Sequence, residues 1–294
     1  MKLPEEIPIL VGEYEDNNAK SGITAVFPEM ENVTGISQKG GAPATMGTEV
    51  LHPMHRKMPS VDAIVFAGRS IFGFIPALAI AKELKKDGKG IKIRDKNIPI
   101  VPAAAIFDFI DNDILPDESW GVIAYEKRKN QISIGRYGAG RGATVGKIMG
   151  IEYSMESGQG FSFLEKNGIY VASISVVNAF GDIYDENGNI IAGAKRNGKF
   201  IKTIKYMENF IKNGMNTTLG LIITNAKMDR EDACSISEAA NISLASIIKP
   251  FNTSFDGDTI FTISFKEREA DIEIVKILAQ EAIRKSVLSI FDSQ

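Results

Sequence analysis

The chain has 294 residues, of which 44% are hydrophobic and 24% charged, and its formal net charge is −3 at pH 7. This near-neutral balance excludes the strongly basic surface that nucleic acids and anionic membranes select. No run approaches the 18 apolar residues of a membrane span, so we expect neither a membrane nor a nucleic-acid partner. The single cysteine, Cys234, rules out an internal disulfide framework, and MKLPEEIPIL lacks an apolar signal stretch, so we expect a cytoplasmic protein.

Histidines are scarce, which limits the catalytic and metal sites that the chain can build. The only two, His52 and His55, lie on either side of Pro53 in a polar stretch. A zinc site normally needs more His or Cys ligands, and no G-x-S-x-G motif supports a serine triad. We interpret both histidines as solvated loop residues and expect no metal and no cofactor. The base of any amide hydrolysis must then come from elsewhere.

The first half of the chain predicts a strand, a helix and a second strand. The apolar run SVDAIVFAG (60–68) is typical of a buried strand, and the residues after it predict a helix that ends near Gly88. A second strand is predicted over 98–107, where two prolines limit it to an edge or an irregular path. The predicted buried face of the helix carries Ile71, Phe74, Leu78 and residues 80–84.

The second half predicts a more regular alternation. Residues 168–193 indicate two strands joined by a turn at Asp185–Gly188. Further strands are predicted over 217–224 and 258–265. A helix follows each of these strands: one over 229–250 with Asp229 as its N-cap, and one over 270–291 with Ile274, Ile277, Leu278 and Leu288 on its apolar face. Because no linker-like stretch interrupts residues 20–291, we expect one α/β or α+β domain with layered sheets and outer helices.

The glycine-rich stretch GRYGAGRGATVGK, which ends at Lys147, resembles a phosphate loop but fails the spacing. Gly142 and Gly146 are separated by three residues instead of four, and Ile148 follows the lysine. The dinucleotide pattern also fails, because Ala143 stands where the third glycine belongs. Two interpretations stay open. Either the backbone packs tightly against a neighbour, or the small residues let N–H groups and Lys147 approach a reacting carbonyl.

Three further polar residues lie where strands are predicted to end or begin. Asn178 follows an apolar run, where an amide must be satisfied as a structural residue or donate to an oxyanion. Asp256 and Asp258 flank Gly257 before the strand over 258–265. Aspartates around a glycine usually form turns, but this spacing also lets both point into one pocket.

The sequence Asn216-Thr217-Thr218 opens the strand predicted over 217–224 and admits two interpretations. Threonine is a good strand former, so a loop-to-strand junction is the simpler interpretation. If the peptide bond before Thr217 were cut, however, the freed α-amine would have a reference pKa of about 7.7–8.0. Thr217 would then supply a nucleophile and its base together, and a catalytic histidine would be unnecessary.

The chain resembles the DmpA-type N-terminal-nucleophile hydrolases. This family includes L-aminopeptidase/D-esterases, β-peptidyl aminopeptidases and endo-type aminohexanoate-oligomer hydrolases. The resemblance runs in family order over nearly the whole chain. It rests on GITAVFPE (22–29), GGAPATMGTEVL (40–51), VDAIVFAGRSIFGF (61–74), IPIVPAAAIFDF (98–109), GAGRGATVGK (138–147), VVNAFGDI (176–183), NTTLGLIITNA (216–226) and PFNTSFDGDTIF (250–261).

The resemblance implies an α+β fold, a four-layer αββα sandwich, made as an inactive precursor. It implies one hydrolase domain, 1–294, that cuts itself between Asn216 and Thr217 into fragments 1–216 and 217–294. Thr217 would be the nucleophile, Asn178 and Lys147 would stabilise the oxyanion or polarise the substrate, and Asp256 and Asp258 would position the nucleophile and its amine. It also implies a small peptide or amide substrate and a homo-oligomer, a tetramer of processed pairs.

Two positions depart from the family pattern. Arg69 stands in a tight segment that we expect along the substrate channel, and Phe107 stands where several members have a tyrosine hydroxyl. Without that hydroxyl, the oxyanion role shifts to Asn178 and Lys147. Two other functions stay open, an acyltransferase of the ornithine-acetyltransferase type and a non-catalytic small-molecule binder. α-Peptide, β-peptide and aminohexanoate-type amides all stay open as substrates.

Overall fold

Two five-stranded sheets form the centre of the molecule, in a computed structural model that describes residues 1–54, 60–110, 112–206 and 216–292. The first sheet runs in the order β1 (Ile9–Asp16), β2 (Ser21–Pro28), β5 (Ile64–Ala67), β8 (Ala103–Ala105) and β4 (Thr45–Met46). The second runs in the order β11 (Gln159–Lys166), β12 (Ile169–Asn178), β17 (Thr217–Ala226), β19 (Thr259–Arg268) and β3 (Val33–Gln38).

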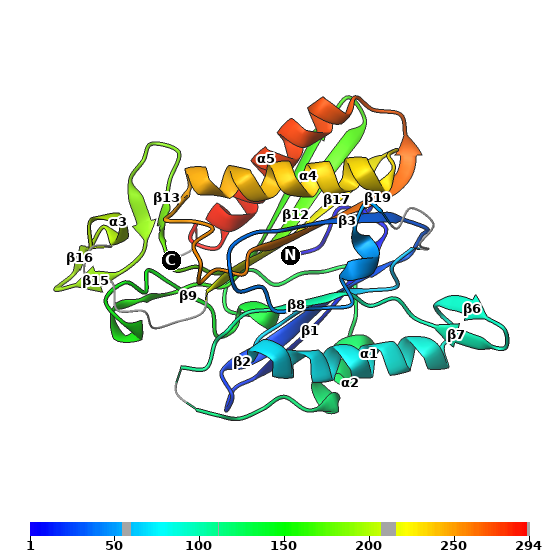
Figure 1. The fold of residues 1–294 in the computed structure, drawn as a ribbon, viewed down its shortest axis with the longest axis horizontal. Helices are drawn as coiled ribbons and strands as arrows, with labels where there is room; N and C mark the ends of the chain where they lie inside the picture. The colour runs from blue at the N-terminus through cyan, green and yellow to red at the C-terminus, as the bar shows by residue number, and fades with distance from the viewer. Residues whose placement is uncertain (55–59, 111, 207–215, 293–294) are drawn as a thin grey trace.

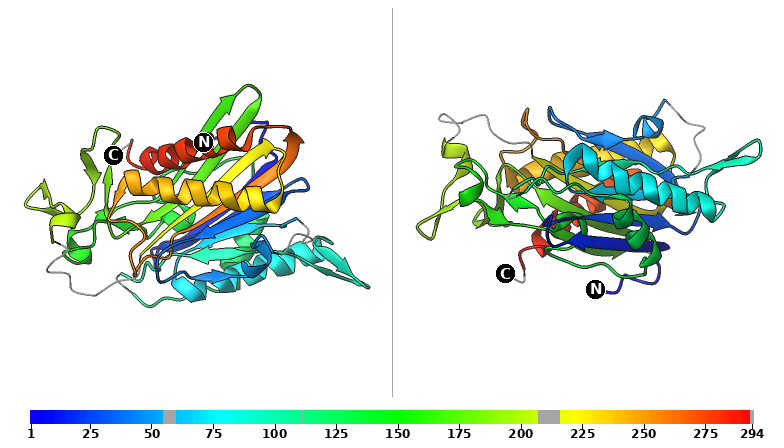
Figure 2. Two further views of the ribbon diagram at one scale, coloured as in Figure 1. Left: turned by 45° about the horizontal axis from the view of Figure 1, so that its top comes forward. Right: turned by 90° about the horizontal axis from the view of Figure 1, so that it is seen from below.

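Helices cover the outer faces of both sheets (Figure 1). α1 (Phe74–Lys86) and α2 (Glu118–Glu126) lie on the first sheet, and α4 (Arg230–Ser243) and α5 (Ile272–Ser289) lie on the second. The turned view in Figure 2 keeps the two helix pairs on opposite sides of the strands. The predicted four-layer αββα sandwich is therefore confirmed.

The inner faces of the two sheets share one apolar core. Phe66 of β5 and Phe261 of β19 meet across it, with ring centroids 6.1 Å apart. Strand β17 shows how the layers divide its side chains. Leu219 and Leu221 face this core, while Ile222 faces the helices α4 and α5, as the alternation of side chains along a strand requires. Both faces of β17 are buried, which explains its nearly continuous apolar sequence.

The predicted helices are present, but part of their predicted buried faces is wrong. Ile71 lies in a 3-10 turn before α1 and is 66% exposed, and Leu78 is 53% exposed. The small side chain of Ala77 lies against the sheet instead, because it allows the helix axis to approach more closely. Ile274 and Ile277 of α5 are likewise exposed, while Val275 and Ala279 are buried.

Helix boundaries follow their caps. Asp229 caps α4 as predicted, and its carboxylate accepts the backbone N–H of Asp232 at 3.0 Å. The helix ends at Ser243 instead of at 250, because a 3-10 turn and the short strand β18 (Ile248–Lys249) follow it. Residues 118–126, to which the sequence analysis assigned no element, form α2.

Short elements fill the connections. The predicted turn at Asp185–Gly188 joins β13 (Asp182–Tyr184) to β14 (Ile190–Ala192), and β13 pairs with β14 on one side and with β18 on the other. The remaining short elements are β6 (Ile91–Ile93), β7 (Lys96–Ile98), β9 (Thr144–Val145), β10 (Met155–Glu156), β15 (Lys195–Arg196), β16 (Lys199–Phe200) and α3 (Thr203–Tyr206). Within the described residues, no helix combines the length and apolar character that crossing a bilayer requires.

Candidate active site

The N-terminal end of β17 is where the sequence-predicted site residues lie. Thr217 is the first residue of the strand and pairs with Asn178, the last residue of β12. On the other side, Asn216 forms a parallel bridge with Asp256, in the segment that leads into β19. All four residues are buried. Segments that are far apart in the sequence therefore meet at one end of the central strands of the second sheet, and this end is called the site edge below.

The peptide bond between Asn216 and Thr217 is held by backbone groups. The Asn216 N–H donates to the Phe255 carbonyl at 2.9 Å, and the Gly257 N–H donates to the Asn216 carbonyl oxygen at 2.9 Å. The Thr217 hydroxyl donates to the same Asn216 oxygen at 2.5 Å. The hydroxyl thus lies beside the carbonyl that it would attack, and an N–H already polarises that carbonyl.

Lys147, the last residue of the glycine-rich stretch, contacts Asn178 at the site edge. Its Nζ donates to the backbone oxygen of Asn178 at 2.9 Å and to Asn178 Oδ1 at 2.8 Å. Gly146 has a φ of +73°, and a Cβ there would overlap the backbone of Gly193 and Ala194. The stretch therefore packs tightly against a neighbour, as the first interpretation expects, and it brings Lys147 to Asn178. The approach of Lys147 to a reacting carbonyl stays a prediction.

The amide of Asn178 makes hydrogen bonds at both of its ends. Its Oδ1 also accepts the Thr144 N–H at 3.1 Å, and its Nδ2 donates to the Phe107 carbonyl at 2.9 Å. These contacts fix which end of the amide carries the donor. The residue that replaces the family tyrosine thus orients Asn178 through its backbone, while its ring is partly exposed and packs against Phe109.

The two aspartates form a buried acidic pair. Burial raises the pKa of the Asp256 carboxyl, although hydrogen bonds from Thr253 and the positive charge of Lys147 oppose the shift. Burial first, and then repulsion from Asp256, raises the pKa of Asp258 well above its usual range. Asp258 Oδ1 accepts the Thr218 N–H at 2.6 Å, which fixes the start of β17. Of the two carboxyls, Asp258 therefore holds a proton more readily than Asp256.

Burial also shifts the pKa of Lys147, but downward, because the charged form of a lysine is the protonated one. It lowers the pKa of Lys147 to about 7, against the opposing attraction of Asp256 and Asp108. A neutral amine has two N–H groups, which match the two oxygens of Asn178, and its lone pair can accept a proton. A protonated amine has a third N–H to offer to a developing oxyanion. Near neutral pH, the site can therefore both take up a proton and stabilise negative charge.

A buried ion pair that the sequence analysis missed supports this edge. Asp108 accepts the Ser21 hydroxyl and the Arg69 backbone N–H, each at 2.7 Å. The Arg69 guanidinium donates to Asn112 O at 2.9 Å and to Ala19 O, and its side chain is 0% exposed. Arg69 itself is therefore buried, whereas Ile71 and Phe72 of the same segment are exposed. The expectation that this segment lies along the substrate channel stays a prediction. The missed signal was Asp108 itself, a carboxylate directly after the apolar run that ends at Phe107.

A cavity of about 200 Å³ opens beside the site. Asp108 and Thr144 line it together with the charged side chains of Lys20, Arg136 and Glu156. Since the Thr144 N–H donates to Asn178 Oδ1, this cavity lies next to Asn178.

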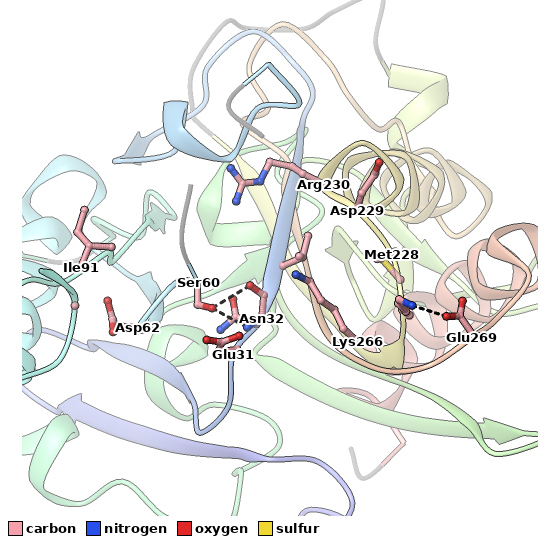
Figure 3. Close-up of a pocket in the computed structure, with 13 residues that line it drawn as sticks. Glu31, Asn32, Ser60, Asp62, Ile91, Met228, Asp229, Arg230, Lys266 and Glu269 are labelled. Carbon is pink, nitrogen blue, oxygen red and sulfur yellow. Dashed lines mark hydrogen bonds and ion pairs between the residues drawn. The ribbon is translucent and has the colours of Figure 1, made fainter. Parts of the chain in front are cut away.

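A larger cavity lies elsewhere. It has a volume of about 810 Å³ and is lined by Asn32, Ser60, Asp62 and the residues just after β17, such as Met228 (Figure 3). Ten residues of extended strand separate the two ends of β17, a span of about 30 Å. Size alone therefore does not identify the reactive site.

The histidines are not part of this arrangement. His52 is exposed in a loop, as expected, and His55 lies outside the described residues. Among the residues that the structure describes, no group of three His, Cys, Asp or Glu side chains is placed to hold a metal ion. Lys147, Asp256 and Asp258 are the ionisable side chains that the structure places around Asn178 and the start of β17.

Two curated relatives match the sequence over most of its length. An uncharacterized aminopeptidase of Mycobacterium bovis is 29% identical over 258 residues, which cover 83% of this chain and 73% of the relative. A 6-aminohexanoate-oligomer endohydrolase of Kocuria sp. is 25% identical over 271 residues, which cover 88% of this chain and 73% of that enzyme.

The fold has a close solved counterpart. The L-aminopeptidase D-Ala-esterase/amidase of Ochrobactrum anthropi, described as a variant of the Ntn hydrolase fold, superimposes with a TM-score of 0.71 at 14% identity. The match covers 99% of this chain and 86% of that one. The sequence profile of Peptidase family S58 matches residues 8–292. The chain therefore belongs to Peptidase family S58 and is a peptide or amide hydrolase with an Ntn hydrolase fold.

Proposed function

We propose that the protein is a self-processing amide hydrolase whose nucleophile is Thr217. The observation that carries the proposal is the Asn216 carbonyl, which accepts both the Thr217 hydroxyl and the Gly257 N–H. A threonine hydroxyl held beside its own preceding carbonyl, with a backbone donor on that oxygen, supports an intramolecular acyl shift, because nucleophile and oxyanion donor are both close to the reacting group.

Self-cleavage proceeds in two steps. Thr217 Oγ attacks the Asn216 carbonyl carbon, the Gly257 N–H stabilises the oxyanion, and the C–N bond breaks as the hydroxyl proton passes to the Thr217 nitrogen. Water then hydrolyses the resulting ester, which gives the Asn216 carboxylate and a Thr217 residue with a free amine and a free hydroxyl. The products are fragments 1–216 and 217–294.

The mature enzyme repeats this chemistry on substrate. The Thr217 amine, with a reference pKa of about 7.7–8.0, takes the proton of its own hydroxyl as Oγ attacks the substrate amide. Asn178 and Lys147 stabilise the negative charge, and the Asp256–Asp258 pair holds the Thr217 ammonium in place. The leaving amine takes the proton, and water releases the acyl group.

The proposal also covers the substrate, the cellular compartment and the oligomeric state of the enzyme. The substrate is a small peptide or amide, in keeping with the aminopeptidase and aminohexanoate-oligomer endohydrolase names of the relatives. The single buried thiol of Cys234 suits the cytoplasm. Exposed apolar side chains on the outer helices, among them Leu78 and Ile277, suit a homo-oligomer of processed pairs.

A denaturing gel and intact-mass analysis test the proposal. Division of 32.0 kDa in proportion to 216 and 78 residues gives expected fragments of about 23.5 and 8.5 kDa, whereas the Thr217→Ala variant should stay at 32.0 kDa and be inactive. N-terminal sequencing of the small fragment should begin Thr-Thr-Leu-Gly. Active wild-type protein that persists as one intact band would refute the mechanism.

A further inference from the structure

Three phenylalanine rings lie in a row that begins at the site edge. The Phe107 and Phe109 rings have centroids 5.5 Å apart, and the Phe109 and Phe72 rings have centroids 6.4 Å apart. Phe107 is the residue whose carbonyl accepts Asn178 Nδ2 at 2.9 Å, and Asn178 pairs with Thr217. The three rings are called the aromatic row below, and the row starts beside the groups that the proposed reaction uses.

The two ends of the aromatic row are open to solvent. Phe107 is 37% exposed and Phe72 is 41% exposed, although phenylalanine is among the residues that proteins bury most often. Ile71 and Ile110, which neighbour the row in the sequence, are exposed as well. Exposed apolar side chains that gather in one place are typical of ligand-binding grooves and of interfaces.

Buried polar groups hold the first two rings in position. Asp108, between Phe107 and Phe109 in the sequence, is buried and accepts the Ser21 hydroxyl and the Arg69 backbone N–H. The carbon atom of the Arg69 guanidinium lies 4.6 Å from the centroid of the Phe109 ring, so a buried cation packs against the middle of the row. Because these groups fix the rings before a ligand arrives, binding there requires little additional ordering of side chains.

The third ring is brought to the row by a turn with unusual backbone angles. Arg69 and Ser70 have φ values of +63° and +53°, a left-handed conformation that is unfavourable for residues other than glycine. The Ser70 N–H donates to the Ile106 carbonyl at 2.9 Å, which fastens this turn to the residue before Phe107. Backbone strain of this kind is concentrated at functional sites, so the turn that presents Phe72 supports a role in ligand binding.

The aromatic row borders the cavity of about 200 Å³. Asp108 and Ile110, which alternate with two of the ring residues in the sequence, line this cavity. Thr144 lines it as well, and its N–H donates to Asn178 Oδ1. The charged side chains of the cavity are those of Lys20, Asp108, Arg136 and Glu156. Close to Asn178, the chain thus offers an apolar surface in the row and charged groups in the cavity.

We propose that the aromatic row is an apolar subsite of the mature enzyme, which binds an aliphatic or aromatic group of the substrate beside the scissile amide. This rests on the proposed function, in which Asn178 and Lys147 stabilise the oxyanion. Asn178 contacts Phe107 and pairs with Thr217, so a carbonyl bound to Asn178 lies close to the start of the row. The substrate class is accordingly an amide with an apolar group on its acyl unit or on its leaving amine.

Pairs of amides that differ in polarity but not in shape test the subsite on the processed wild-type enzyme. Leucine and asparagine have side chains of nearly the same shape. L-Leucyl and L-asparaginyl p-nitroanilides, with their β-amino-acid counterparts, vary the acyl unit. Leucine and asparagine as amine components of L-alanyl and β-alanyl dipeptides vary the leaving amine. We expect kcat/KM for the leucine compound to exceed that for the asparagine compound at least tenfold, or about 1.4 kcal/mol, in at least one series.

Two variants separate the aromatic row from the rest of the protein. Phe107→Ala and Phe72→Ala should each lower the leucine-to-asparagine ratio of kcat/KM at least threefold. Phe107→Ala keeps the backbone carbonyl that holds Asn178, so processing should persist. Ile93→Ala is the control, because Ile93 is exposed in β6, beyond the opposite end of α1 (Figure 1), and it should keep the wild-type ratio. Each ratio compares two substrates on one sample, so the amount of active enzyme cancels.

The outcomes separate the subsite from the proposed function. A ratio below tenfold in both series, or no hydrolysis of any leucine compound, overturns the subsite while the nucleophile stands. A reduction of less than threefold in either phenylalanine variant overturns it as well. If size-exclusion chromatography then shows that Phe72→Ala changes the oligomeric state, the row is an interface between copies of the chain. An active wild-type chain that remains unprocessed instead overturns the proposed function.

Discussion

Replacing Lys147 by methionine tests the electrostatics on which the candidate site depends. The comparison is made in the Thr217→Ala background, so that every sample is one intact chain. Burial lowers the pKa of Lys147 from 10.5 to about 7. Between these two values, the unfolded chain binds a proton at Lys147 that the folded chain does not bind. Folding stability contributed by Lys147 therefore rises with pH through this window.

The size of the effect follows from the two pKa values. With 10.5 in the unfolded state and about 7 in the folded state, the free energy of unfolding should rise by about 2 kcal/mol between pH 7 and pH 9. Methionine has a similar length and no ionisable group, so Lys147→Met should lack this rise. Charges that both chains share cancel in the comparison.

Urea unfolding followed by fluorescence measures the difference. Trp120, the only tryptophan, is 4% exposed and should report global unfolding. Lys166→Met, at an exposed position on β11, is the matched control and should leave the pH dependence unchanged. If the Lys147→Met and reference chains change in parallel from pH 7 to pH 9, to within about 0.5 kcal/mol, Lys147 is not buried as an amine of lowered pKa and the reasoning fails.

Two further substitutions probe the groups around the lysine. Because burial and Asp256 raise the pKa of Asp258, the folded chain holds a proton that the unfolded chain loses as pH rises. Asp258→Asn should therefore gain stability relative to wild type from pH 4 to pH 7 in the same urea assay, and a loss over that range would contradict the assignment. Arg69→Met leaves Asp108 buried without its cation and should cost about 3 kcal/mol in urea unfolding. A cost below about 1 kcal/mol would show that the pair does not support the fold.

Sequence patterns predicted the layers well where periodicity and caps are strong. The strand over 217–224 and the Asp229 cap are present because apolar runs and capping side chains act locally. The buried faces of α1 and α5 were harder to predict. Alanines lie against the sheets there and larger residues such as Leu78 stay exposed, which depends on how close each helix approaches its sheet.

The candidate site likewise depends on tertiary contacts that local sequence patterns do not encode. Spacing alone could not relate Lys147, Asn178 and Asp256, because they meet only through the pairing of β12 and β17 and the bridge at Asn216. The family resemblance supplied these residues. It did not supply Asp108 or the backbone role of Phe107, since each acts through hydrogen bonds that no local pattern encodes.

The strand order of the second sheet has a consequence for how the protein must be made. β17 and β19 belong to segment 217–294, yet they lie between β12 and β3 of segment 1–216. Neither segment alone can close the sheet, and each would expose unpaired strand edges that favour aggregation. We therefore expect the sheet to form while the bond before Thr217 is still intact. Once the sheet has formed, β12 and β3 hold the inserted strands from both sides, and continuity of the chain at that point is no longer needed.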